Sequence, residues 1–198
     1  MKPAIKLAAI AVLAAAAAAA LYFYTRPAPQ PDRQALLQQS AHVKRQARAP
    51  DFALPDLDGN LHALSQWRGR LRLINFWATW CGPCREEVPA LVALQKRFGK
   101  RGFEVVGIAT DEPSTKPVKA FARKYGINYP LLMDDGNAAD IAAHLGFQLI
   151  GLPASVLVGP GGRIIDYHLG PIDPAKLRQQ IENQLNGRKK QTNVADPL

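Results

Sequence analysis

The sequence predicts an α/β fold in which a mixed central sheet is flanked by helices, with an N-terminal β-hairpin extension. Three observations lead to this prediction. Residues 71–77 and 103–110 are nearly continuous apolar runs, as expected for strands buried on both faces. A segment with helical spacing of apolar residues follows each run. Strand–helix–strand order implies parallel pairing, and a later pair of strands joined by a tight turn adds antiparallel pairing.

Length and charge limit the function classes. The chain has 198 residues, which is enough for one domain with extensions. Its net charge is +9, but the basic residues are concentrated at the two ends. Residues 51–185 carry fifteen basic and fourteen acidic side chains, a net charge of only +1. A nucleic-acid-binding domain should carry its own basic face, so we do not expect this protein to bind nucleic acid.

The N-terminus resembles a membrane-spanning segment. Residues 7–25 carry no charge, and as a helix they would span roughly 28 Å, close to the thickness of a bilayer core. Aromatic residues at 22–24 and a following arginine suit a membrane interface. We therefore predict a membrane anchor over residues 1–25. A cleaved signal peptide remains the alternative, because the run of small alanines at 14–20 contains a plausible cleavage site.

The rest of the chain divides into three parts. Residues 26–48 are rich in Pro, Gln and Arg and are expected to form a linker. Residues 49–187 are expected to fold as one domain, and residues 188–198 to be a disordered tail. The domain begins with alternating apolar residues around the turn DLDGN, which predicts the hairpin.

The later elements follow from periodicity and from start and stop signals. Pro89 lies inside the helix after Cys84 and should kink it. Gly126 should end the next helix, and Asp173-Pro174 should begin the last one, with Gly187 as its end. In order, we expect a helix after residue 81, a strand at 103–110, a helix at 118–125, an extended piece at 130–134, a helix at 138–145, strands at 152–159 and 163–170, and the final helix.

The two cysteines of the chain, Cys81 and Cys84, are separated only by Gly82 and Pro83. A disulfide across so short a loop would add only about 2 kcal/mol, so a purely structural bridge is disfavoured. Structural zinc normally has four ligands, but there is no second cysteine pair and the four histidines are scattered. We expect no metal and no cofactor, although copper(I) held by the two thiolates stays open as an alternative.

Redox chemistry explains the cysteine spacing best. Cys81 should lie at the N-terminus of a helix, where the helix dipole and free amides stabilise a thiolate. Cys84, one turn further along, should be shielded and close enough to attack a mixed disulfide. Pro83 stiffens the turn, and Trp80 could form an apolar rim for a docking protein. We therefore predict that Cys81 is the nucleophile and Cys84 the resolving cysteine.

The stretch FWATWCGPCREEVPAL, together with the hairpin sequence APDFALPDLDG and the segment GLPASVLVGPGGRII, resembles the thioredoxin fold. More narrowly, these features resemble the TlpA/ResA-like membrane-anchored thiol–disulfide oxidoreductases. The resemblance covers residues 49–185. It implies that Pro153 is a cis-proline beside the cysteines and that the backbone of Leu152 can pair with a substrate strand.

The resemblance also implies an acidic residue near the cysteines that could accept the resolving thiol's proton. We assign this role to Glu112, with Asp111 as the competing position. Plain thioredoxin has a buried Asp six residues before its first active-site cysteine, where this chain has Asn75. Asn cannot titrate, which favours the extracytoplasmic branch and gives Glu112 a larger role.

The resulting functional expectation is an extracytoplasmic reductase of disulfides in exported client proteins, for example in cytochrome c or copper-site assembly. Electrons would come from a membrane donor of the DsbD/CcdA type. The catalytic domain would lie on the periplasmic face of the inner membrane. The Gly-Pro dipeptide resembles reducing thioredoxin (about −270 mV) more than oxidising DsbA (about −120 mV), but an oxidase remains an alternative. A peroxidase is disfavoured because no proline precedes Thr79 nearby and Cys84 supplies a local partner.

Overall fold

The computed structural model describes residues 48–110, 114–134 and 136–194, with side chains as far as residue 187. The expected anchor and almost all of the expected linker lie outside these residues, and both stay predictions. Within the described ranges, no helix has the length and apolar character needed to cross a membrane.

The centre of the domain is a sheet of five strands in the order β5-β4-β3-β6-β7. Strand β3 is parallel to β4, and β4 is parallel to β5, whereas β6 runs antiparallel to both β3 and β7. The predicted fold class is therefore confirmed. The strands are β3 (Leu71–Trp77), β4 (Phe103–Ala109), β5 (Leu131–Met133), β6 (Ala154–Val158) and β7 (Ile164–Leu169).

Strand β5 is the element that the sequence identified least well. The prediction gave only an extended piece there, because three apolar residues carry little periodicity. In the structure these residues pair with Gly107–Ala109 of β4 and close one edge of the sheet. The strand assignment depends on this neighbour, which the local sequence does not reveal.

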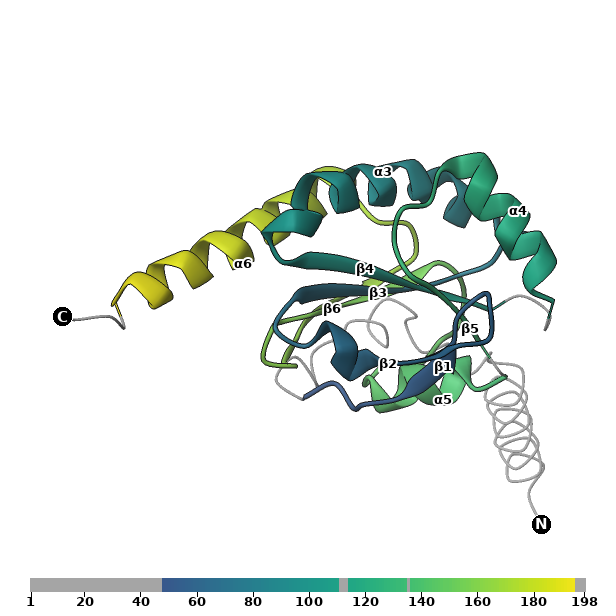
Figure 1. The fold of residues 1–198 in the computed structure, drawn as a ribbon, viewed down its shortest axis with the longest axis horizontal. Helices are drawn as coiled ribbons and strands as arrows, with labels where there is room; N and C mark the ends of the chain where they lie inside the picture. The colour runs from purple at the N-terminus through teal and green to yellow at the C-terminus, as the bar shows by residue number, and fades with distance from the viewer. Residues whose placement is uncertain (1–47, 111–113, 135, 195–198) are drawn as a thin grey trace, which may run out of the picture. The chain divides into compact units, whose positions relative to one another are not determined.

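Helices cover both faces of the sheet, as Figure 1 shows. One face is covered by α3 (Gly82–Phe98), α4 (Thr115–Tyr125) and α6 (Pro174–Val194). The other is covered by α5 (Ala138–His144), the antiparallel hairpin of β1 (Ala53–Pro55) and β2 (Leu61–Ala63), and the short helix η1 (Leu64–Trp67). A further short helix, η2 (Gly99–Arg101), follows α3.

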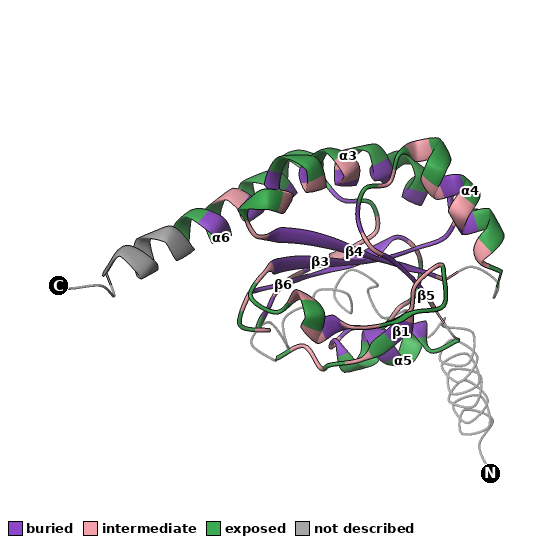
Figure 2. Cartoon of the chain, viewed as in Figure 1, coloured by how far each residue is buried: buried purple, intermediate pink, exposed green. Residues whose placement is uncertain are grey.

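Alternation along β3 divides the core into two layers. Leu71, Leu73 and Trp77 belong to the apolar cluster on the α3 side, whereas Ile74 and Phe76 belong to the cluster on the α5 side. All seven residues of the strand are buried, and Figure 2 shows the central strands buried along their length. A strand buried on both faces explains why this run is almost continuously apolar.

Most predicted boundaries are confirmed, with one clear error. Gly126 ends α4 in the left-handed conformation (φ 63°), and the Asp173 carboxylate accepts bonds from the amides of Ala175 and Lys176 at the start of α6. The predicted end of α6 at Gly187 is wrong, because the helix continues to Val194. One glycine costs a helix only about 1 kcal/mol, and the Lys, Arg and Gln residues that follow are good helix formers. Residues 195–198 of the expected disordered tail lie outside the described ranges.

Candidate active site around Cys81 and Cys84

The cysteine pair lies where the chain leaves the sheet and enters α3. Strand β3 ends at Trp77, and Cys81 is the N-cap residue of the helix. The amide of Cys84 donates to the Cys81 sulfur at 3.3 Å, so this sulfur takes the place of a capping oxygen. Pro83 occupies the first turn, where its missing amide has no helical partner to lose. The predicted position of Cys81 at a helix N-terminus is confirmed.

The two sulfurs form a disulfide, and their residues differ in exposure. Cys81 is 6% exposed and Cys84 is completely buried, with Cα atoms 5.3 Å apart. Access from solvent is therefore restricted to Cys81. In the reduced form the free amides and dipole at the N-terminus of α3 would stabilise a thiolate on Cys81.

The segment before β6 reaches the same end of the sheet. The Leu152–Pro153 peptide is cis, as the resemblance implied. Ala154 pairs with Phe76 in the antiparallel β3–β6 register, so Pro153 lies level with the end of β3. Leu152 packs against the cluster that contains both cysteines. Two segments about seventy residues apart in sequence thus lie at the same end of the sheet.

Large apolar side chains are exposed around this end of the sheet. Trp80, immediately before Cys81, is 68% exposed, and Ile150, just before the cis peptide, is also exposed. A Cβ added to Gly82 would meet no atom within 4 Å, so the first position between the cysteines faces open space. The surroundings of Cys81 therefore suit contact with an apolar protein segment.

A buried carboxylate lies on the same helix as the cysteines. Glu87 is 5% exposed and is held at both oxygens. Its Oε1 accepts from Asn75 Nδ2 at 2.8 Å, and its Oε2 accepts from the Ile172 amide at 3.1 Å. Asn75 Nδ2 also donates to Ser155 Oγ at 3.0 Å. The network joins α3 to β3, to β6 and to the segment that precedes α6.

Glu87 is suited to carry a proton. Burial raises the pKa of this carboxyl above its usual value, and the hydrogen bonds from Ile172 and Asn75 oppose that rise. Glu87 follows Cys84 by three residues on α3, and side chains at that spacing are neighbours on one helix face, with Cβ atoms about 5–6 Å apart. The carboxyl group of Glu87 therefore lies on the same helix face as Cys84.

Sequence reasoning overlooked Glu87. The available signal was its position within the apolar stripe of α3, since Cys84, Val88 and Leu91 are buried on the same face. In the sequence Asn75 is notable only as a residue that cannot titrate, whereas in the structure it acts as a hydrogen-bond donor. It presents a buried amide donor to Glu87.

Glu112 and Asp111 lie outside the described residues, so the role expected for either stays a prediction. Among the described residues, no group of three or more His, Cys, Asp or Glu side chains is placed to hold a metal ion. His62 lies on the hairpin, bonded to Asp56 at 2.9 Å and to Gln66 at 2.8 Å.

Comparison with known proteins agrees with this geometry. The sequence profile of the AhpC/TSA family matches residues 46–167. The chain is 33% identical over 151 residues to the thioredoxin-like protein YneN of Bacillus subtilis, an alignment covering 75% of this chain and 85% of YneN. It is 32% identical over 135 residues to the thiol-disulfide oxidoreductase ResA of Geobacillus thermodenitrificans, covering 68% and 75% of the two chains.

Solved structures give the same result. A thiol:disulfide interchange protein of the thioredoxin family from Chlorobium tepidum superposes with a TM-score of 0.64 at 31% identity, covering 71% of this chain and 97% of that one. A thiol:disulfide interchange protein from a Bacteroides species gives a TM-score of 0.65 at 25% identity, covering 77% and 97%. The chain therefore belongs to the AhpC/TSA family of thioredoxin-like proteins, as a thiol–disulfide oxidoreductase.

Proposed function

We propose that this oxidoreductase is a reductase that acts on disulfides in exported client proteins, with Cys81 as the attacking and Cys84 as the resolving cysteine. The observation that carries the proposal is the difference between the two sulfurs. The sulfur of Cys81 caps the N-terminus of α3 and this residue keeps 6% of its surface exposed, whereas Cys84 is completely buried. Only Cys81 can reach a disulfide in another protein.

The reaction has two steps that transfer two electrons to the client. In the first, the Cys81 thiolate attacks one sulfur of the client disulfide, and the other client sulfur leaves as a thiolate that takes up a proton. In the second, Cys84 loses its proton to the Glu87 carboxylate and attacks the Cys81 sulfur. The second client sulfur then leaves, and the enzyme is left with the Cys81–Cys84 disulfide. A carboxylate with a raised pKa is a better proton acceptor for a thiol than an ordinary surface acid.

Client recognition in this proposal uses the apolar surface around Cys81. Trp80 and Pro83, which flank Cys81 in sequence, are exposed, and Leu152 forms the cis peptide with Pro153. An extended client segment would lie against these side chains and form backbone hydrogen bonds with Leu152. The open space at Gly82 leaves room for the client chain to approach.

The proposed location is the periplasmic face of the inner membrane, with residues 1–25 as a single anchor. The uncharged run at residues 7–25 and the flanking basic residues support this location. After each turnover the disulfide must be reduced again, and we propose a membrane thiol donor of the DsbD/CcdA type. Apocytochrome c or a copper-site assembly protein would be a fitting client.

Trapping tests the assignment of the two cysteines. A Cys84→Ala variant should accumulate a mixed disulfide with insulin, used as a disulfide substrate, because the second step cannot occur. A Cys81→Ala variant should form none and serves as the matched control. Equal trapping by both variants, or trapping by Cys81→Ala alone, would contradict the proposed order of attack.

Redox titration tests the direction of electron flow. The Cys81–Cys84 couple is equilibrated with glutathione or dithiothreitol buffers and quantified by thiol alkylation. A potential near that of thioredoxin, about −270 mV, agrees with a reductase, whereas one near DsbA, about −120 mV, identifies an oxidase.

Protease protection and salt washing of membranes would test the anchor, since a cleaved signal peptide would leave the domain soluble.

A further inference from the structure

The end of the sheet remote from the cysteines contains a buried arginine. Arg72 lies near the start of β3, on the face that Ile74 and Phe76 share, and is only 3% exposed. Its guanidinium donates to two backbone oxygens, to Leu64 O at 3.1 Å and to Gly159 O at 3.3 Å. Its Nε is buried and has no hydrogen-bond partner in the described part of the chain.

The charge of Arg72 is not neutralised by a direct ion pair. Among the described residues, no carboxylate lies within salt-bridge distance of its guanidinium. Asp51 is the nearby acid, but its Oδ1 accepts the Ser65 amide at 2.9 Å. Burial lowers the pKa of Arg72, the neighbouring charge of Arg68 lowers it further, and Asp51 opposes the change. Arginine remains protonated all the same, so a buried positive charge persists here.

This arginine opens onto a cavity of about 410 Å³. Its lining, as far as the described residues form it, includes three arginines, Arg48, Arg68 and Arg72, and a single acid, Asp51. The turn Pro160–Gly162 closes one side and holds the chain next to Arg48, since the Ala49 amide donates to Gly162 O at 2.8 Å. These described lining residues therefore carry a net charge of +2, and the cavity has the size of a small-molecule site.

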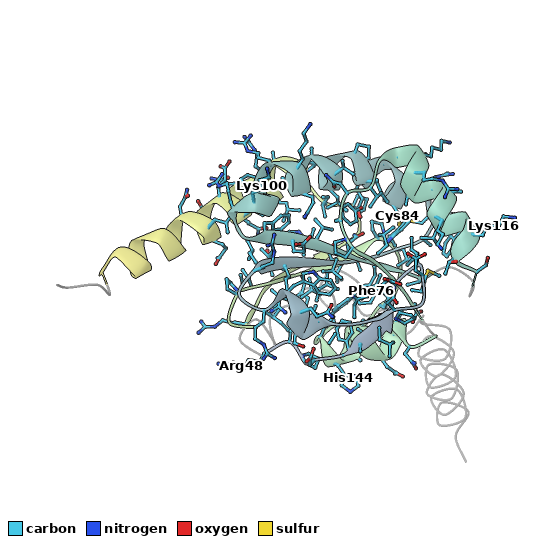
Figure 3. The ribbon with its side chains drawn as sticks, viewed as in Figure 1. Arg48, Phe76, Cys84, Lys100, Lys116 and His144 are labelled. Atoms are coloured by element: carbon cyan, nitrogen blue, oxygen red, sulfur yellow. A yellow bond between two sulfur atoms is a disulfide. The ribbon has the colours of Figure 1, made fainter. Side chains whose placement is uncertain are left out.

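The cavity is separate from the active site. Arg72 and Trp77 are five residues apart on β3, which corresponds to roughly 17 Å along the strand. Figure 3 labels Arg48 and Cys84 at opposite ends of the domain. A ligand in the cavity would not touch the disulfide.

We infer that this cavity is an anion-binding site that holds a phosphate group between Arg48, Arg68 and Arg72. Guanidinium groups bind phosphate oxygens through paired, charge-assisted hydrogen bonds, and several of them can share one anion. A bound phosphate would place a negative charge beside the cation of Arg72, which has no direct ion pair among the described residues. The phosphate could belong to a soluble compound or to a lipid headgroup, since both present the same oxygens.

Titration of the full-length protein in a neutral detergent tests this inference. Inorganic phosphate, added at constant ionic strength against chloride, should bind saturably as measured by calorimetry. Arg68→Gln should weaken the affinity about tenfold, or about 1.4 kcal/mol, which is the size expected for one hydrogen bond to a charged group. Arg123→Gln is the matched control, because it removes the same charge from an exposed position on α4 and should leave the affinity unchanged.

A second arm distinguishes the two sources of phosphate. Mixed micelles containing phosphatidylglycerol or phosphatidylcholine replace the free anion. Binding to phosphatidylglycerol micelles that is lost in Arg68→Gln, with no response to inorganic phosphate, assigns the site to a lipid headgroup. Binding of inorganic phosphate itself assigns it to a soluble compound.

The inference is overturned if neither probe binds saturably, or if Arg68→Gln and Arg123→Gln weaken binding equally, because binding would then be a general effect of net charge. Arg72→Gln is a further variant, but Arg68→Gln and Arg48→Gln keep the test valid if loss of Arg72 prevents folding. The proposed redox function is tested separately, since Cys81→Ala should bind phosphate as tightly as the parent protein.

Discussion

Glu87, which packs against β3, and Arg72, which lies on it, are both buried charged residues, but the protein accommodates them in different ways. Glu87, at the cysteine end, receives hydrogen bonds at both oxygens and can lose its charge by taking up a proton. Arg72, at the opposite end, donates only to backbone oxygens and cannot lose its charge. The comparison indicates a site for proton transfer at one end of the sheet and a site for a counter-anion at the other.

Removal of the proposed nucleophile, Cys81, should abolish the reduction of insulin by this protein. Cys81→Ser should reduce insulin no faster than buffer does, since Cys84 is buried and cannot attack a client disulfide. Turbidity of insulin reduced by dithiothreitol with catalytic amounts of protein measures this. Substantial activity in Cys81→Ser would mean that the buried sulfur is reached by a route absent from this structure.

Loss of the carboxylate at Glu87 should slow the second chemical step. Glu87→Gln removes the proposed proton acceptor, so release of the client from the mixed disulfide should slow by about 10²–10⁴-fold. Single-turnover quenching with acid separates this step from the initial attack, which should change much less. Glu86→Gln is the matched control, because Glu86 is the exposed neighbour on the same helix. An equal effect of both variants would exclude a specific role for Glu87.

Loss of the cation at the other end should lower stability. Arg72→Ala removes the side-chain donor from Leu64 O and from Gly159 O, which keeps only the Gly162 amide, and opens a cavity in the core. We expect the free energy of unfolding to fall by about 2–4 kcal/mol, measured by urea denaturation. Arg123→Ala should change it by less than about 0.5 kcal/mol, as is usual for an exposed side chain. Little change in Arg72→Ala would show that the buried charge costs as much as its hydrogen bonds provide.

Glu87 should also make stability depend on pH. Burial raises its pKa above the usual value of 4.5, so the folded state binds this proton more tightly than the unfolded state. The stabilisation is therefore complete below about pH 4.5 and is lost as the pH rises through the folded-state pKa. Urea unfolding of Glu87→Gln should show a smaller decline above pH 4.5 than the parent protein. An identical decline in both would assign it to other groups.

The smallest expected effect is at the surface of the hairpin. The hydrogen bond that His62 donates to Asp56, and then the one that it donates to Gln66, raises the pKa of His62 above 6.5. The pair stabilises the hairpin below pH 6.5 and less as the pH rises through the folded-state pKa. The protection factors against amide exchange at Asn60 and Leu61, corrected for the intrinsic pH dependence of exchange, should therefore fall over that range in the parent protein but not in His62→Gln. Water screens the charges of the exposed His62–Asp56 pair, so this pair should contribute less to stability than the buried Glu87 and Arg72 do.

The fold could be predicted wherever a local pattern was strong. Strand β3, the hairpins and the start of α3 agree with the expectations, since apolar runs, turn residues and a helix N-terminus are local signals. The prediction was incomplete at β5, because its three residues form a strand only by pairing with β4. It was wrong at Gly187, because the good helix formers around this glycine continue α6 to Val194. The site shows the same contrast: the cysteines were evident, but Glu87 was hidden in a stretch of charged residues, Arg85 to Glu87.

The sequence by itself determined the redox pair, its place at a helix N-terminus and the family resemblance, because each depends on residues adjacent in the chain. Only the tertiary structure decided which charges are buried. Glu87 and its neighbour Glu86 are chemically identical in sequence, but one faces the sheet and the other solvent. In the sequence Arg72 is likewise only one of 25 lysines and arginines, whereas in the structure strand pairing and η1 bury it. Burial changes what a charge costs and what it can do, and burial results from packing between segments far apart in the chain.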